Sequence, residues 1–146
     1  CLMPTNLYGP NDNYDLEKSH FFPALLRKII EAKKNKSKFL EIWGNGKVKR
    51  ELMFVDDVAY ACEFFLKKKV SHSLINIGSG IEKTIEGYAK FLMKKLNVNL
   101  IIKFDKSKPN GTPRKIIDSS LAISYGWRHK FSLEKGLENT LKDYLK

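Results

Sequence analysis

His20 is the side chain best suited to proton transfer in this sequence of 146 residues. It ends a long polar loop, residues 6–19, and immediately precedes an amphipathic helix predicted over about 21–34. The ordinary pKa of histidine is ~6.5, so an imidazole can both give and take a proton near neutral pH. Long loops of this kind are often functional. The alternative interpretation is a histidine that only helps to start the helix.

Arg50 and Trp43 lie on either side of the turn Gly44-Asn45-Gly46-Lys47, and together they suit a phosphorylated ligand. A guanidinium presents a planar fork of donors that matches a phosphate. An indole offers an aromatic face and one N–H donor. The competing interpretations are a surface arginine paired with Glu51 and a core tryptophan beside a glycine turn.

The two cysteines and the histidines other than His20 do not form a metal-ligand pattern, so no metal site is expected. Cys62 lies in a predicted helix, where a buried small hydrophobic residue is the usual role. Cys1 is interpreted as part of a core strand. His72 and His129 are isolated in the sequence and are interpreted as surface or packing residues.

The formal net charge is +11, with 23 lysines but only four arginines. Proteins that read nucleic acids depend strongly on arginine, so no nucleic-acid partner is expected. Most of the charge is interpreted as a solvated surface, and a small anion such as a diphosphate is the better candidate ligand. The sequence has no signal-peptide pattern and no apolar stretch near ~20 residues. We therefore expect a cytoplasmic protein without a membrane partner.

Strands and helices alternate along the chain, which is typical of the α/β class. The helices at 56–68, 84–96 and 132–145 are expected to begin at the caps Asp56, Thr84 and Ser132, and Ser19 is the expected cap of the helix before them. The strands predicted at 39–43 and 50–55 could form a hairpin. The other predicted elements are strands at 1–5, 74–77 and 100–104 and a short helix at 119–125. The length suits one compact unit.

Several strings resemble, in order, the C-terminal part of the GDP-L-fucose synthases, which are extended short-chain dehydrogenases. The more particular strings are Met3-Pro4-Thr5-Asn6-Leu7-Tyr8-Gly9-Pro10 and Lys108-Pro109-Asn110-Gly111-Thr112-Pro113-Arg114-Lys115. Trp43-Gly44, Arg50-Glu51, Val55-Asp56-Asp57 and Ile75-Asn76-Ile77-Gly78-Ser79-Gly80 fit the same pattern. The resemblance implies the end of a Rossmann-type cofactor domain, at about 1–10 and in parts of 50–80. It also implies a small mixed α/β substrate-binding domain.

The resemblance implies conversion of GDP-4-keto-6-deoxy-D-mannose to GDP-L-fucose, by epimerisation at C3 and C5 and then reduction of the C4 ketone by NADPH. It implies that His20 is catalytic and also touches the cofactor. Pro4, Thr5, Asn6 and Leu7 would lie along the nicotinamide, and the alternative is a plain strand-to-loop connection. Lys28, Trp43, Arg50 and Asn110 would bind the GDP-sugar. Lys28 stands where arginine is common and is otherwise a solvated helix lysine, whereas Asn110 stands where aspartate is common.

Parts of the enzyme pattern are missing. No Gly-x-x-Gly-x-x-Gly turn follows a strand, and no Tyr-x-x-x-Lys pair lies on a predicted helix. The family's catalytic Ser, Cys, Tyr and Lys would precede the part that this sequence matches. We therefore expect a fragment that is inactive alone and belongs to a homodimeric enzyme. The alternatives are another nucleotide-sugar epimerase, dehydratase or reductase, and a non-enzymatic nucleotide-sugar-binding module.

Overall fold

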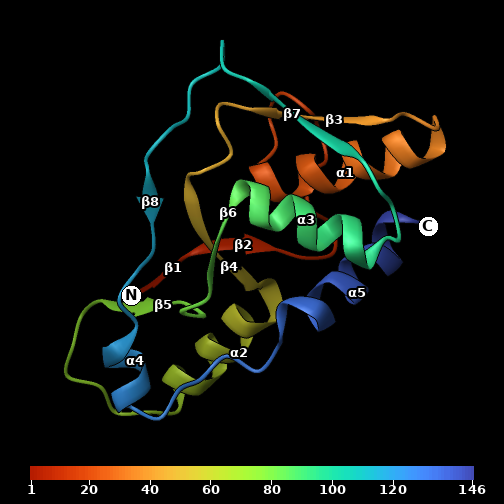
Figure 1. Cartoon of the computed structure of the whole chain (residues 1–146). Coiled ribbons are helices and arrows are strands. Elements are labelled where there is room, and N and C mark those ends of the chain that lie inside the picture. The colour runs from red at the N-terminus through yellow and green to blue at the C-terminus, as the bar shows by residue number, and fades with distance from the viewer. The chain divides into compact units, whose positions relative to one another are not determined.

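The computed structural model describes residues 1–146 and has the mixed α/β composition that the sequence predicts (Figure 1). The chain forms two compact units, each built from separated stretches. Unit 1 comprises residues 1–12, 51–82 and 116–146, and unit 2 comprises residues 13–50 and 83–115.

Unit 1 carries two pairs of parallel strands. In the first pair, β1 (Leu2–Pro4) lies beside β5 (Ile75–Ile77). In the second, β2 (Asn6–Tyr8) lies beside the end of β4 (Lys49–Phe54). The helices of the unit are α2 (Val55–Leu66), α4 (Ser120–Ser124) and α5 (Leu133–Tyr144). A buried cluster unites strand and helix residues around Trp127, and its other members are Met53, Ala61, Ile75, Ile77 and Ala122.

Unit 2 packs α1 (Phe21–Lys34) and α3 (Ile85–Lys95) with a pair of parallel strands, β3 (Phe39–Trp43) and β7 (Ile101–Asp105). It also contains the start of β4, most of β6 (Glu82–Thr84) and the two-residue strand β8 (Arg114–Lys115). Successive side chains of a strand point to opposite faces. Leu40 and Ile42 of β3 are therefore buried, whereas Phe39, Glu41 and Trp43 are exposed.

The predicted hairpin between residues 39–43 and 50–55 is wrong. Strand β3 pairs with β7 in parallel. Strand β4 lies between β2 and β6 in its sheet and also pairs with β8, and its pairings with β2 and β8 are parallel. Gly44 and Gly46 do turn the chain with positive φ angles of 71° and 68°. A local turn signal shows only that the chain changes direction, and the partner of each strand is decided by side chains much further along the sequence.

Two burial predictions and two cap predictions are also wrong. Cys1 and Cys62 are both exposed. Helix α1 begins after His20 rather than after Ser19, and α2 begins after Phe54, which places Asp56 inside its first turn. A cap is set by the backbone conformation before the first turn, so a polar side chain in the right neighbourhood is not sufficient.

The two other cap predictions are confirmed. The Thr84 side chain accepts the Gly87 N–H at 2.9 Å, and the Ser132 side chain accepts the Lys135 N–H at 3.2 Å. No helix of the structure is long and apolar enough to cross a membrane. No group of three or more His, Cys, Asp or Glu side chains is arranged to hold a metal ion.

Candidate functional site

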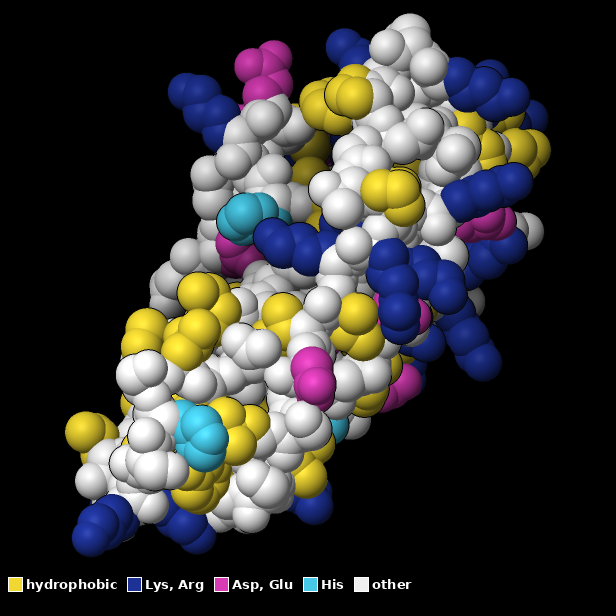
Figure 2. Space-filling view, turned by 90° about the vertical axis from the view of Figure 1, so that its left-hand side faces the viewer, with side chains coloured by type: hydrophobic (Ala, Val, Ile, Leu, Met, Phe, Trp, Pro, Cys, Tyr) yellow, Lys and Arg dark blue, Asp and Glu magenta, His cyan; other side chains and the backbone are white.

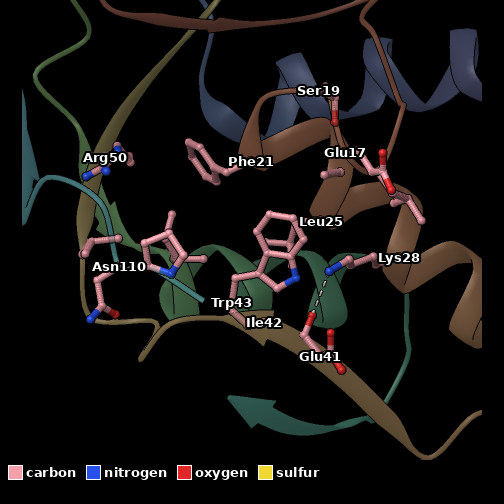
Figure 3. A pocket seen from close by; sticks show the side chains of 15 residues that line it. Glu17, Ser19, Phe21, Leu25, Lys28, Glu41, Ile42, Trp43, Arg50 and Asn110 are labelled. Atoms are coloured by element: carbon pink, nitrogen blue, oxygen red, sulfur yellow. Dashed lines mark hydrogen bonds between the residues drawn. The ribbon is translucent and has the colours of Figure 1, made fainter. Parts of the chain in front are cut away.

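Unit 2 contains a pocket of about 250 Å³, and the structure brings four of the predicted site residues together in its wall. These are Lys28, Trp43, Arg50 and Asn110. In Figure 3 the Trp43 indole lies between Lys28 on one side and Arg50 and Asn110 on the other. These four residues contribute an indole, two cations and an amide, and Phe21, Glu17 and Glu41 also line the pocket.

Helix α1 positions Lys28 in the pocket wall. Phe21, Leu25 and Lys28 follow one another at helical spacing, so they share one face of the helix and all line the pocket. The Lys28 ammonium donates to the Glu41 carbonyl at 3.3 Å, as the dashed line in Figure 3 marks. It also lies 5.4 Å from the centroid of the Trp43 ring. Lys28 is therefore directed to the site and is not a freely solvated lysine.

Trp43 ends β3 on the exposed face of the strand, and 47% of its surface is exposed. The interpretation of this residue as a core tryptophan is therefore wrong. An exposed indole at the mouth of a pocket costs hydrophobic stabilisation, because its large apolar surface stays in water. Such a side chain is suited to stack against a ring of a ligand.

Arg50 points away from its neighbour Glu51, because the two are successive residues of a strand. Its Nη1 donates to the carbonyls of Lys49 and Thr112, both at 2.7 Å. These bonds hold the guanidinium in place and leave its other N–H groups available to an anion. Glu51 is buried and accepts backbone N–H groups of unit 1, so the alternative of a surface Arg50–Glu51 pair is wrong.

Strand β8 places one more cation, Lys115, beside Arg50, and sequence reasoning did not single out this lysine. Lys49 lies opposite Arg114, and Arg50 lies opposite Lys115. Like charges directly across a strand pair repel each other. A bound anion would relieve this repulsion. The only signal in the sequence is the Arg-Lys dipeptide, because its pairing with β4 depends on a register that the tertiary structure sets.

The positive charge of the protein is concentrated in unit 2. This unit has 19 Lys and Arg against 6 Asp and Glu, a net charge of +13, whereas unit 1 has 8 against 10, a net charge of −2. Figure 2 shows a cluster of Lys and Arg side chains at the upper right of the view. The field of such a surface raises the local concentration of anions.

Asn110 belongs to the loop after β7 and is engaged with the turn after β3. Its Oδ1 accepts the Asn45 N–H at 2.7 Å. It also lies so close to Gly44 that a Cβ at that position would collide with it. Gly44 therefore serves both the left-handed backbone and the close approach of Asn110.

His20 is exposed at the start of α1 and does not line the pocket, although its neighbours Ser19 and Phe21 do. Its backbone is extended, and its side chain makes no capping hydrogen bond. The interpretation of His20 as a side chain that helps to start the helix therefore has no support from a side-chain cap.

Residues 4–7 lie in unit 1, at the junction between β1 and β2. The Thr5 backbone N–H donates to the Ile77 carbonyl at 3.0 Å, and the Asn6 side-chain amide donates to the Glu51 backbone carbonyl at 2.9 Å. Pro4 has no N–H. Two of the donors of this segment are thus used within the unit.

One Tyr-x-x-x-Lys spacing does occur in the chain, at Tyr14 and Lys18. These residues lie in an irregular segment with turns before α1, not on a helix. The spacing aligns two side chains only on a helix, where residues four apart share a face. This pair is therefore not arranged as a catalytic Tyr-x-x-x-Lys pair.

The parallel strands, the site and the sequence agree with known proteins. Residues 1–78 match the model of the NAD dependent epimerase/dehydratase family. The chain belongs to this family.

Two curated relatives each match this family member over 99% of its length, and both are GDP-L-fucose synthases. GDP-L-fucose synthase 1 of Arabidopsis thaliana is 46% identical over 99% of this chain and 45% of its own length. GDP-L-fucose synthase of Escherichia coli is 40% identical over 99% of this chain and 48% of its own length. The chain thus spans about half the length of these relatives.

A solved structure of a GDP-L-fucose synthetase from Naegleria fowleri bound to NADP superimposes with a TM-score of 0.86. The two chains are 26% identical, and the superposition covers 99% of this chain and 46% of the synthetase chain. The arrangement of helices and strands is therefore that of a known family member.

Proposed function

We propose that the chain is the nucleotide-sugar-binding part of an NADP-dependent GDP-L-fucose synthase. The observation that carries the proposal is the pocket of unit 2, in which Lys28, Trp43, Arg50 and Asn110 meet. The resemblance of the sequence to GDP-L-fucose synthases predicts the same four residues as contacts of a GDP-sugar. The similarity to GDP-L-fucose synthases over nearly the whole chain supports the same substrate class.

The proposed reaction converts GDP-4-keto-6-deoxy-D-mannose to GDP-L-fucose. The C4 ketone acidifies the hydrogens at C3 and C5, so epimerisation needs a group that removes a proton and one that returns a proton. We propose His20 for one of these roles. Its imidazole is exposed and has no capping bond, so both ring nitrogens are open to a substrate.

The diphosphate of the substrate would lie on Arg50 and on Lys115, its neighbour across β4 and β8. Arg50 offers paired donors to one phosphate, and Lys115 adds a point charge. Trp43 would stack on a ring of the ligand, and Lys28 beside it would provide a further cation. The net charge of unit 2 favours such an anion at long range.

NADPH would supply the hydride that reduces the C4 ketone. Within this chain, Pro4, Thr5, Asn6 and Leu7 are the proposed contacts of the nicotinamide, together with His20. Because the Thr5 N–H and the Asn6 amide are engaged, this segment would meet the carboxamide chiefly through backbone carbonyls. A carboxamide N–H₂ is a suitable donor to these acceptors.

In this proposal, unit 1 is the end of the cofactor-binding domain and unit 2 is the substrate-binding domain. The stretches 1–12 and 51–82 of unit 1 correspond to the segments expected for the cofactor domain. Unit 2 contains the whole proposed GDP-sugar pocket. The homodimer of the complete enzyme and its cytoplasmic location stay predictions.

A nucleotide panel tests the substrate class. GDP, UDP and dTDP are each added to the 146-residue chain, and the shift of its melting temperature is measured. We expect GDP to give the largest shift and Arg50→Gln to reduce it. An equal or larger shift with UDP or dTDP would indicate another nucleotide-sugar enzyme. Binding of all anions alike, with a steep loss in salt, would indicate a polyanion-binding module.

The role of His20 is tested in the complete enzyme by exchange of substrate hydrogens with deuterated water. His20→Asn should abolish deuterium incorporation at C3 and C5, while GDP still binds. Exchange at the parental rate would refute the assignment. Lys18→Ala, an exposed residue two positions earlier that does not line the pocket, controls for a general disturbance of this segment.

A further inference from the structure

A second lysine reaches the aromatic face of the pocket from a distant part of the chain. The Lys108 ammonium lies 5.3 Å from the centroid of the Trp43 ring, almost the same distance as the Lys28 ammonium at 5.4 Å. Lys28 comes from α1, whereas Lys108 comes from the loop after β7. Each ammonium gains only modestly from the ring. An anionic group of a ligand held at Trp43 would be attracted to both cations.

The loop that carries Lys108 starts with a compact turn. The Asp105 carboxylate accepts the Ser107 N–H at 3.0 Å and the Ser107 hydroxyl at 2.6 Å. The Lys108 N–H donates to the Asp105 carbonyl at 3.3 Å. These bonds fix the direction in which the chain leaves β7, so Lys108 is not at the free tip of an unstructured loop.

Asn110 fastens the other side of this loop to the turn after β3. Its Oδ1 is used by the Asn45 N–H, and its side chain and backbone pack on Gly44. Trp43 immediately precedes that turn. The same contact therefore holds the segment with Lys108 beside the segment with Trp43, which are far apart in the sequence.

We infer that Lys108 is a further contact of the nucleotide diphosphate and that Asn110 is a positioning residue that acts through Lys108 rather than a ligand itself. The inference rests on the proposed function of the pocket and extends it. The diphosphate would lie on Arg50 and Lys115, and Lys108 would add a further cation from the side of Trp43. Asn110 would set the affinity indirectly, by keeping the loop docked on the turn.

Fluorescence titration tests both roles on the 146-residue chain. The chain has two tryptophans, and Trp127→Phe leaves Trp43 as the only reporter. GDP and guanosine are titrated into this background and into Lys108→Ala, Asn110→Ala and the double variant. Lys106→Ala, an exposed lysine of the same loop, is the matched control.

We expect Lys108→Ala to raise the Kd for GDP about fivefold, the size of a contact between a phosphate and a partly solvated cation. The Kd for guanosine, which has no phosphate, should change less than about twofold. Asn110→Ala should give a similar loss for GDP, and the double variant should be no worse than either single variant. Asn110→Asp keeps an acceptor for the Asn45 N–H and should bind GDP more tightly than Asn110→Ala.

Three results would each overturn a different part of this inference. If Lys108→Ala binds GDP as its parent does while Arg50→Gln does not, the Lys108 contact is refuted and the proposed function stands. If the losses of Lys108→Ala and Asn110→Ala add in the double variant, Asn110 is a ligand itself. If the parent does not bind GDP, the proposed function is refuted and this inference with it.

Discussion

Glu51 is a buried carboxylate whose substitution gives a sharp test of the fold of unit 1. None of its surface is exposed. Its Oε1 accepts the Gly80 N–H at 2.7 Å, and its Oε2 accepts the Ile117 N–H at 3.1 Å. One side chain on β4 thus satisfies backbone donors of two other segments.

Glu51→Gln should destabilise unit 1 by about 2 kcal/mol. A glutamine retains one oxygen acceptor, so one of the two backbone N–H groups would face an amide N–H₂ and lose its partner. A buried donor without a partner costs ~1–3 kcal/mol. Removal of a buried charge returns part of its desolvation penalty, which limits the loss. Glu51→Leu leaves both N–H groups without a partner and should cost about 4 kcal/mol.

Urea unfolding followed by Trp127 fluorescence measures these values. Trp127 is a buried residue of unit 1, and the Trp43→Phe background removes the signal of unit 2. Glu63→Gln is the matched control, because Glu63 forms an exposed, solvent-screened pair with Lys67 and should leave the urea midpoint nearly unchanged. A Glu51→Gln variant as stable as this control would refute the two-acceptor role of the carboxylate.

Three further predictions concern local features. Gly136→Ala should destabilise unit 1 by roughly 1–3 kcal/mol despite the better helix propensity of alanine, because the new Cβ would collide with Tyr8, and an unchanged urea midpoint would contradict this packing. Thr84→Ala should lower the free energy of unfolding by about 1 kcal/mol through loss of the α3 cap, whereas Thr84→Ser keeps the hydroxyl and should not. Urea unfolding monitored by Trp43 fluorescence measures both variants. Equal stability of the two would exclude the cap. The backbone N–H groups of Lys18 and then Glu17 donate to the Asp15 carboxylate and lower its pKa. The turn that these bonds form is therefore fully stabilised at pH values above the ordinary aspartate pKa of ~3.9. It loosens as the pH falls through the lowered pKa. An NMR titration in which the Asp15 carboxyl has its midpoint at or above ~3.9 would contradict this last prediction.

The candidate site was only partly predictable from the sequence. Arg50 and Trp43 were recognisable from their chemistry beside a glycine turn, and Lys28 and Asn110 only through the resemblance to a family. Lys108 and Lys115 were not recognised as site residues. Lysine is frequent in this chain, and nothing local distinguishes a lysine that faces a pocket from one that faces water. Their neighbours Trp43 and Arg50 each lie 65 positions away in the sequence.

The sequence by itself determined the features that depend on a few adjacent residues. The apolar spacing of α1, the caps Thr84 and Ser132 and the alternation of helices and strands all arise from local backbone and side-chain preferences. The tertiary structure decided which strands pair, which face of a helix or strand is covered, and where the charge gathers. The parallel pairing of β3 with β7, the exposure of Cys62 and the buried hydrogen bonds of Glu51 are of this second kind. Each depends on contacts between residues far apart in the chain, which no short pattern contains.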